Sequence, residues 1–505
     1  MKHLLFVLCL LGIYICPTFA TTYYLDVQHG KDTFNGTSIK TPWKSVGKLA
    51  NVKLKAGDKV LLKRGCTFNG VLEINAQGTD AKSVIIGAYG KSTVKPLIKG
   101  TDNSLYAVRI YNSTNVTFRD IAIINTGKER LARRTGLKIE CINYGISRNI
   151  TIDNITISDV NGSLVKEKGG GSGLLIVNGG KEKISTYENM LIQNCHILRC
   201  SRNAMIWNGY IDRNNWHPSR NLIVRNNLIE QVPGDGIVPI GFDHVLIEYN
   251  IMRDCPDILP DTEAAAGFWP WSCDNTIIQY NEVSGHKAPW DAQGYDSDYN
   301  CTNTIIRYNY SHDNYGGMVL VCNSGEGGYN IGNLNTRVMY NISIGDGIRP
   351  KPARGNMFSP AIHIGGPVKN TLIEHNIIHQ NRKASKSIDS TMITSDSWNG
   401  YSDSTFINNN VFYAAAPSRF NLTKSTHNFF SDNYYLGTYD QLPSDKKMKN
   451  SSAYYRKEVL TIDPNGYKGL QKLMKPKTIC GVRGLFVDKN LIEDFFKKLN
   501  SPINN

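Results

Sequence analysis

Three aspartates lie close together in the middle of the chain, next to a tryptophan. Asp291 and Asp298 are seven residues apart, Asp296 lies between them, and Trp290 precedes the group. Paired carboxylates can act as the acid and the nucleophile or base at a glycosidic bond. The same oxygens could hold Ca²⁺, or the segment could be a solvated turn. We predict that all three aspartates are catalytic, with Glu326 as a further candidate carboxylate.

A second group of residues suits a different reaction. A lyase that acts on a uronic acid needs a base for the proton next to the sugar carboxylate, and groups that neutralise the developing charge. His312 and Tyr315 follow the aspartates and are candidate bases, although a lone histidine is more often structural. Exposed aromatic rings could stack on sugar faces. The candidate substrate-binding residues are Trp269, Trp271, His286, Lys287, Trp290, Arg307, Arg349, Lys351 and Arg354.

All these residues lie within a repeat that must position them. Short apolar, often β-branched runs end in asparagine, at Asn227, Asn250, Asn281, Asn309, Asn341, Asn376 and Asn410. Such short strands predict an all-β, single-domain right-handed parallel β-helix, with the recurrent asparagines as an internal ladder between coils. A propeller is the competing fold, but its regular longer blades are absent from the sequence.

The spacing between repeats varies, so extra residues must leave the coils as loops. In a solenoid such loops emerge mostly on one face, where they build a groove. Because His312 lies just beyond the strand after the aspartates, we expect it to face the same groove as they do. The candidate loops are 165–172, 207–219, 256–272, 285–299, 323–333, 346–358 and 394–404.

The two ends of the chain differ from the repeats. Residues 1–20 have the basic start, apolar run and small-residue end of a secretory signal peptide. We assign residues 21–65 to an N-terminal cap, 66–435 to the β-helix and 436–505 to a C-terminal capping segment, because an open coil end would expose core. Helical spacing predicts that residues 491–499 form a helix across that end, with one apolar face made of Leu491, Ile492, Phe495, Phe496 and Leu499.

Charge and cysteine content limit the partners and the compartment. The formal net charge is +14, which suits a polyanionic partner or serves solubility alone. Nucleic acid fits poorly because no binding module is recognisable, and no apolar stretch is long enough to span a membrane. The scattered cysteines favour buried thiols over a disulfide framework. We expect a monomer, periplasmic or secreted, with an acidic poly- or oligosaccharide substrate.

The N-terminal segments 23–27, 42–45 and 56–65, together with the repeats, resemble secreted right-handed β-helix carbohydrate-active enzymes. The resemblance covers residues 22–435 and implies work on carbohydrate, in a group that includes polysaccharide lyases and glycosidases. The spacing of Asp291 and Asp298 is similar to the closely spaced aspartate pair of the β-helix lacto-N-biosidase group. The motifs of polygalacturonases are missing, which disfavours that family.

Three functions remain open. We favour a lyase that cleaves a uronic-acid-containing polysaccharide, glycosaminoglycan- or pectin-like, by β-elimination. The alternative is a glycoside hydrolase that uses an Asp/Asp or Asp/Glu pair. The third is a non-catalytic carbohydrate-binding solenoid, which the density of titratable groups in one region disfavours. The only candidate cofactor is Ca²⁺, on the three aspartates.

Overall fold

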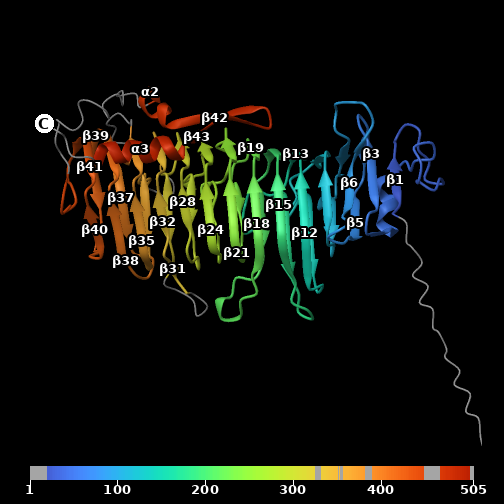
Figure 1. Ribbon diagram of the computed structural model, residues 1–505, viewed down its shortest axis with the longest axis horizontal. Helices are drawn as coiled ribbons and strands as arrows, with labels where there is room; N and C mark the ends of the chain where they lie inside the picture. Colours follow the sequence, from blue (N-terminus) through green and yellow to red (C-terminus); the bar gives the residue numbers. More distant parts are fainter. Residues whose placement is uncertain are drawn as a thin grey trace, which may run out of the picture.

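The computed structural model describes residues 20–324, 331–350, 352, 357–380, 389–422, 424–448 and 467–500. The chain is a parallel β-helix, as predicted, whose strands stack in rows along the long axis of the molecule (Figure 1). The predicted signal peptide, apart from Ala20, lies outside the described residues. So do Glu326, Lys351 and Arg354.

The first row runs the length of the molecule and begins inside the predicted N-terminal cap. It contains β1 (Thr22–Leu25), β3 (Lys59–Lys63), β6 (Val84–Tyr89), β9 (Val116–Arg119), β12 (Ile146–Asp153), β15 (Thr186–Gln193), β18 (Ser219–Arg225), β21 (Phe242–Glu248), β24 (Asp274–Gln279), β28 (Ile305–Arg307), β32 (Arg337–Met339), β35 (Val368–Glu374), β38 (Asp403–Asn408) and β40 (Asn428–Ser431), with β31 (Asn333–Leu334) paired to β35.

The second row is parallel to the first and follows it in each coil. It contains β4 (Thr67–Asn69), β7 (Leu97–Lys99), β10 (Ala122–Asn125), β13 (Thr156–Val160), β16 (His196–Cys200), β19 (Leu228–Glu230), β22 (Ile251–Arg253), β25 (Glu282–Ser284), β29 (Tyr310–His312), β33 (Ile342–Ile344), β36 (Ile377–Gln380), β39 (Val411–Asn421) and β41 (Tyr434–Tyr439).

The third row carries the candidate site. Phe268 bridges its two halves by pairing with both Ile237 and Tyr295. The row contains β2 (Lys53–Lys55), β5 (Leu72–Gln77), β8 (Tyr106–Tyr111), β11 (Thr135–Ile142), β14 (Ser172–Gly179), β17 (Asn203–Asn208), β20 (Ile237–Val238), β27 (Tyr295–Ser297), β30 (Val319–Cys322), β34 (Ile362–Gly365) and β37 (Thr391–Asp396).

Several short elements lie outside the three rows. In the loops, β23 (Ala264–Ala265) pairs with β26 (Trp290–Asp291), and η1 (Val46–Asn51) and η2 (Arg213–Asn215) are 3-10 helices. At the C-terminus are α2 (Tyr467–Leu470), η3 (Gln471–Leu473), β42 (Met474–Ile479), β43 (Val482–Val487) and α3 (Lys489–Asn500).

The core is built from side chains that stack in register from one coil to the next. In the first row, for example, Ile247, Ile278, Ile306 and Val338 are consecutive partners, and all four are buried. β-Branched side chains suit this position because they pack well on a pleated surface with neighbours above and below. The short apolar runs of the sequence are therefore the inward faces of the strands.

The recurrent asparagines form the predicted internal ladder. Asn309, for example, donates from Nδ2 to Oδ1 of Asn341 at 3.0 Å and accepts at its own Oδ1 from Nδ2 of Asn281 at 3.0 Å. All seven predicted ladder residues are buried, and Asn433 extends the ladder by one coil. Each amide thus satisfies polar groups that turn inward at a corner, where water cannot reach them.

The residue before each ladder asparagine turns the corner in the left-handed conformation. Tyr280, Tyr308 and Tyr340 have φ between 52° and 56°, which is costly for a bulky side chain. Their rings point outward and stack on one another, with centroids 5.3 and 5.5 Å apart. Tyr249 and His375 continue the same stack at its two ends. We call this row of five rings the corner stack.

The C-terminal segment covers the corner stack. β42 and β43 form an antiparallel hairpin. The hairpin and α3 lie along the flank of the β-helix (Figure 1). Phe496 of α3 packs against Tyr340 and His375, and Tyr308 donates a hydrogen bond to Glu493 at 2.6 Å. The predicted helix is therefore present, but it lies on the flank instead of across the open end, because its apolar face matches the corner stack.

The cysteines are thiols in this structure. Eight of the nine described cysteines are buried, and only Cys480, at the tip of the β42–β43 hairpin, is exposed. Among the described residues, no helix is both long enough and apolar enough to cross a membrane.

Candidate active site

Strand alternation in the third row places two aspartates on the outer face. Tyr295 and Ser297 of β27 point inward, where the Tyr295 hydroxyl donates to the carbonyl of Tyr310 at 2.8 Å. Asp296 and the following Asp298 therefore project outward, since side chains alternate along a strand. Asp291 joins them from β26, which lies in the loop before β27.

The three aspartates line one cavity with a volume of about 470 Å³. We call it the acidic pocket. Its described lining consists mostly of carboxylates, aromatic rings and small side chains: Lys166, Asp235, Ala264, Ala265, Ala266, Trp269, Trp271, Trp290, Asp291, Asp296, Asp298, Tyr299, Leu320, Cys322 and Trp398.

Burial changes the acid–base behaviour of the aspartates. Burial and then the charge of Asp298 raise the pKa of Asp291 to about 6. Burial and the neighbouring carboxylates raise the pKa of Asp296 well above its ordinary range. Burial also raises the pKa of Asp298, while hydrogen bonds from the Cys322 thiol and the Tyr299 backbone lower it. Close carboxylates disfavour each other's ionised form, so the pocket keeps its protons to higher pH than isolated aspartates would.

The carboxylate oxygens differ in their partners. Asp298 Oδ1 accepts from Tyr299 N at 2.6 Å and from Cys322 Sγ at 3.2 Å. Oδ1 of Asp296, a residue only 4% exposed, has no hydrogen-bond partner among the described residues. A buried polar atom without a partner is costly, so a ligand hydroxyl that reaches it would be stabilised.

A buried ionic network holds the floor of the pocket. Arg202 is fully buried and pairs with Asp235 at 2.8 Å and with Glu263 at 3.1 Å. Asp235 in turn accepts a hydrogen bond from the Trp269 indole at 3.1 Å, and Glu263 accepts one from the backbone of Lys166 at 2.9 Å. The network fixes the orientation of Trp269 and holds the Lys166 loop against the pocket.

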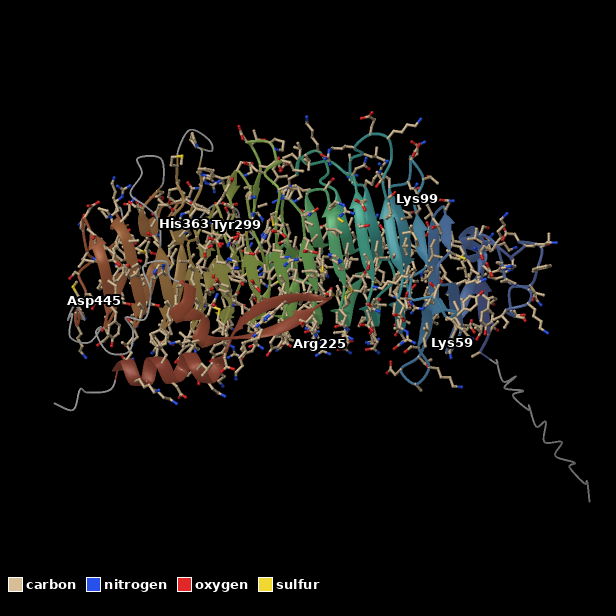
Figure 2. All side chains as sticks on the ribbon, turned by 90° about the horizontal axis from the view of Figure 1, so that it is seen from above. Lys59, Lys99, Arg225, Tyr299, His363 and Asp445 are labelled. Carbon is tan, nitrogen blue, oxygen red and sulfur yellow. The ribbon has the colours of Figure 1, made fainter. Side chains whose placement is uncertain are left out.

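A chain of aromatic rings surrounds the aspartates. Successive ring centroids from Trp271 through Tyr299, Trp398, His363 and Phe358 to Trp290 lie between 4.8 and 6.5 Å apart. We call this chain the ring wall, and two of its members, Tyr299 and His363, are labelled in Figure 2. A Cβ at Gly365 would lie 2.9 Å from the Trp398 ring, so only glycine allows Trp398 to lie there. Aromatic faces beside carboxylates suit a sugar, which has apolar faces and hydroxyl edges.

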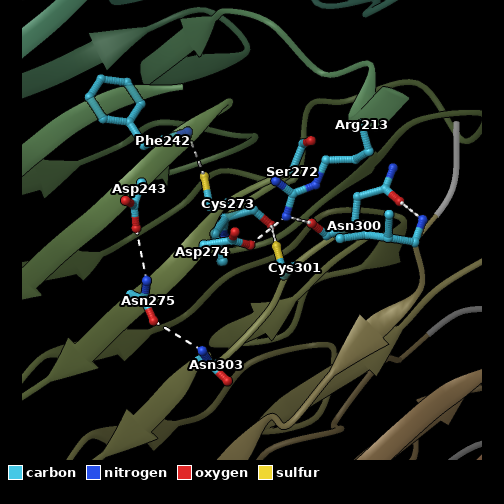
Figure 3. A network of polar contacts seen from close by, with 12 residues as sticks. Arg213, Phe242, Asp243, Ser272, Cys273, Asp274, Asn275, Asn300, Cys301 and Asn303 are labelled. Carbon is cyan, nitrogen blue, oxygen red and sulfur yellow. Dashed lines mark hydrogen bonds and ion pairs between the residues drawn. The ribbon is translucent and has the colours of Figure 1, made fainter. Parts of the chain in front are cut away.

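The backbone beyond Asp298 is anchored by the loop that follows β17. Arg213 donates to the carbonyl of Asn300 at 2.8 Å and pairs with Asp274, while Ser272 donates to the carbonyl of Ile211 at 3.0 Å (Figure 3). The segment that carries Asp298 and Tyr299 is thus tied to a loop that lies three positions earlier along the third row. We infer a supporting role for this loop, since none of its residues lines the acidic pocket.

His312 does not share the groove of the aspartates, and that prediction was wrong. It lies in β29 of the second row, where it pairs with Asp313 at 2.8 Å and Glu282 at 3.2 Å. Burial lowers the pKa of His312, but the hydrogen bonds to these two carboxylates raise it to about 9. Glu282 also accepts from the backbone of Leu485 at 2.7 Å, so His312 belongs to the contact with the C-terminal hairpin.

Arg307 also lies away from the pocket. It is in β28 of the first row and donates to Gln279 of the neighbouring coil at 2.9 Å. Lys287 is half-buried and does not line the pocket. Both were predicted to bind substrate. Arg307 was misplaced because a strand pattern does not say which row a strand joins, whereas Lys287 is in the predicted loop 285–299 but away from the pocket.

Three other predicted residues lie behind the Asp291 loop instead of facing the substrate. The guanidinium of Arg349 is buried and donates to the backbone carbonyls of Ala288 at 2.9 Å and Asp291 at 3.0 Å. Burial lowers the pKa of His286 to about 4, and its Nε2 contacts the carbonyl of Gly234 at 2.9 Å. Tyr315 packs against the small apolar cluster under the loop. These side chains position Asp291 and leave little surface for a ligand.

Sequence reasoning found the aspartates and Trp269, Trp271 and Trp290, but missed several other residues of the site. Lys166 and Trp398 lie in loops that the repeat spacing had identified, and so could have been considered. Asp235 lies between two glycines and Cys322 ends an apolar run, so neither gave a local signal of a site.

Calcium on the three aspartates was the one candidate cofactor, and the described residues give it no support. No three His, Cys, Asp or Glu side chains within the described ranges come together as metal ligands. Asp291, Asp296 and Asp298 line the same pocket without forming such a group.

The fold is a parallel β-helix, and outward carboxylates and aromatic rings share one pocket on its third row of strands. No family model matches the chain. The chain is 26% identical to the lacto-N-biosidase of Bifidobacterium longum subsp. longum over 440 residues, which cover 68% of this chain and 27% of that protein.

Solved structures give a similar result. The crystal structure of the GH136 lacto-N-biosidase from Eubacterium ramulus superposes with a TM-score of 0.57 and 26% identity, over 70% of this chain and 64% of that one. The chain thus spans less than two thirds of either relative. Neither relative is described as a lyase.

Proposed function

We propose that this chain is a glycoside hydrolase in which Asp291 and Asp298 are the carboxylate pair. The observation that carries the proposal is the acidic pocket itself, where the two side chains share one cavity but differ in surroundings. Two carboxylates whose environments separate their proton affinities are the usual arrangement for acid and nucleophile or base at a glycosidic bond.

Asp291 suits the role of general acid. Its pKa of about 6 keeps a proton available to the leaving oxygen at mildly acidic pH. Burial raises the pKa of Asp298 as well, but two hydrogen bonds from fixed donors favour its ionised form and offset part of that rise. It therefore suits the nucleophile or base. Asp296, with its pKa raised well above the ordinary range, suits a neutral hydrogen-bond donor to a sugar hydroxyl.

The pocket favours a neutral sugar over a uronic acid. The described lining has a single lysine and includes Asp298, the proposed ionised carboxylate, so a sugar carboxylate would meet like charge with little positive charge to pair with. Three of the described residues that supported the lyase hypothesis lie elsewhere: His312 and Arg307 on other rows, and Arg349 against backbone. The lyase hypothesis has therefore lost its structural support, and the hydrolase alternative is the better one.

The similarity to two lacto-N-biosidases indicates which substrates to try first. We propose glycans that end in lacto-N-biose, with other neutral oligosaccharides as comparison. We further propose that the protein is exported, on the evidence of residues 1–20 alone.

The test is product analysis on purified protein and on the variants Asp291→Asn and Asp298→Asn. We expect wild-type protein to release new reducing ends without ultraviolet absorbance, and Asp298→Asn to lose at least roughly 10³-fold in kcat/KM, because it removes the nucleophile or base. Asp291→Asn should lose less on aryl glycosides, whose leaving groups need little protonation.

Asp254→Asn is a matched control, since it makes the same chemical change at an exposed site. It should retain wild-type activity. An ultraviolet-absorbing product on polyuronates, or full activity in Asp298→Asn, would refute the assignment.

A further inference from the structure

A second, much smaller cavity lies next to Asp291. It is lined by Trp290, Asp291, Gln293, Phe358, Ser359 and His363, and has a volume of about 10 Å³ available to a water-sized sphere. That is about the room that one water molecule needs. Gln293 is 3% exposed, and its Oε1 has no hydrogen-bond partner among the described residues. The lining is polar enough to hold a water between Asp291 and His363.

His363 is held firmly on the far side of this cavity. It projects outward from β34, and its Nε2 lies 3.0 Å from Oδ1 of Asp396. The ring is enclosed edge-to-face by Phe358 and Trp398, and the side chain is 5% exposed. With Nε2 occupied by a carboxylate, Nδ1 is the ring nitrogen left to exchange a hydrogen bond with another group.

Asp396 connects this arrangement to solvent. Its side chain is 29% exposed, whereas that of His363 is nearly closed off. Asp291, the small cavity, His363 and Asp396 thus form a sequence of polar groups that leads from the acidic pocket to the surface. The four parts come from three different coils, on β26, β34 and β37.

We propose that His363, oriented by Asp396, is a positioning residue that sets the proton occupancy of Asp291 through a water in the small cavity. The proposal rests on the hydrolase function and deepens it. No net proton is consumed: the proton that Asp291 gives to the leaving oxygen is replaced from the water that attacks the sugar. His363 acts on the affinity of Asp291 for that proton and does not touch the substrate.

The other charged groups around Asp291 also change its pKa, some in the same direction as His363 and some in the opposite direction. Asp298 and Asp235 disfavour its ionised form, whereas His363 and Arg349 favour it. Arg349 contacts only the backbone carbonyl of Asp291, at 3.0 Å. His363 pairs with Asp396, lines the small cavity together with Asp291, and is otherwise enclosed by aromatic rings. Loss of His363 should therefore raise the pKa of Asp291.

The test is a carboxyl carbon-13 NMR titration of the full chain, together with the pH profile of kcat/KM, for wild type, His363→Gln and Asp396→Asn. We expect the pKa of Asp291 and the alkaline limb of the profile to rise by roughly 0.5–1 unit in His363→Gln. Asp396→Asn should move both in the same direction, because the ring loses the carboxylate that orients it. Loss of the Asp396 charge alone would move them the opposite way.

A double variant and a control test whether Asp396 affects Asp291 only through His363. Asp396→Asn should have no further effect in the His363→Gln background. His427→Gln, which breaks an exposed His–Asp pair at 3.0 Å on the first row, should leave Asp291 unchanged. An unchanged Asp291 titration in His363→Gln would overturn the proposal even if the protein hydrolyses glycans. A shifted titration without hydrolysis would instead refute the proposed function and leave the coupling intact.

Discussion

At the scale of single residues, the face of the strand decides what a side chain can do. Asp296 and Asp298 point outward into the acidic pocket, while Tyr295 and Ser297 beside them are part of the core. The pocket is enclosed by aromatic rings, so its carboxylates are poorly hydrated and hold protons at higher pH than usual. Because the folded state favours their protonated forms, ionising these carboxylates at neutral pH lowers the stability of the folded protein.

That cost leads to a prediction for Asp291. Its folded pKa of about 6 lies above its ordinary value of 3.8, so its favourable contribution is complete below about pH 4 and is lost as pH rises through 6. Asparagine cannot ionise, so a protein with asparagine at this position does not lose this stability as pH rises. We expect Asp291→Asn to equal wild type at pH 4 and to be more stable by roughly 1–3 kcal/mol at pH 7.5. Urea unfolding at both pH values measures the difference.

The control for this prediction is again Asp254→Asn, at an exposed position. It should show no pH-dependent gain. Equal pH dependence of stability in Asp291→Asn and wild type would mean that Asp291 titrates normally in the folded protein.

At the scale of elements, the asparagine ladder is what allows short strands to turn sharply and repeat. Asn309 uses both amide groups: Nδ2 donates to Ile278 O at 2.9 Å and to Asn341, and Oδ1 accepts from Asn281. The exterior carries a second ladder, in which Asn303 donates to Asn275 at 3.0 Å (Figure 3). Water can replace a partner in the exterior ladder but not in the buried one.

The two ladders should therefore respond differently to the same substitution. Asn309→Ala leaves several buried groups without partners and should lower the free energy of unfolding by about 3 kcal/mol or more. Asn303→Ala, at φ 59° on the surface, should cost only about 1 kcal/mol. Chemical denaturation of both variants provides the measurement. Similar losses in the two would contradict the assignment of the fold's stability to the inner ladder.

At the scale of the whole molecule, charge is distributed unevenly. The chain has a net charge of +14, but the acidic pocket has four aspartates to one lysine. The excess of positive charge therefore lies outside the pocket and gives little information about the substrate. It favours weak association with polyanions outside the pocket.

This separation can be measured. We expect a polyanion such as polygalacturonate to bind the protein at low ionic strength, and binding to weaken as salt rises toward 0.15 M and beyond. It should not inhibit hydrolysis of a neutral substrate, because the two sites differ. Competitive inhibition by the polyanion would place it in the acidic pocket and revive the acidic-substrate hypothesis.

The sequence by itself determined the fold, the inner ladder and the centre of the candidate site. These features are local: a coil repeats its strand pattern, and the three aspartates and Trp290 lie within a few residues. The sequence could not assign strands to rows. His312 and Arg307 are therefore near the aspartates in sequence but on other faces of the molecule.

Only the tertiary structure decided which residues from different coils meet. Stacking brings Asp235, Cys322 and Trp398 to the acidic pocket and His363 to the small cavity beside it, although each lies in its own repeat. The physical reason is that register between coils depends on the lengths of the intervening loops and on packing against the neighbouring coil. Neither can be inferred from the local sequence pattern. The same is true of the position of helix α3, whose apolar face packs against the corner stack on the flank.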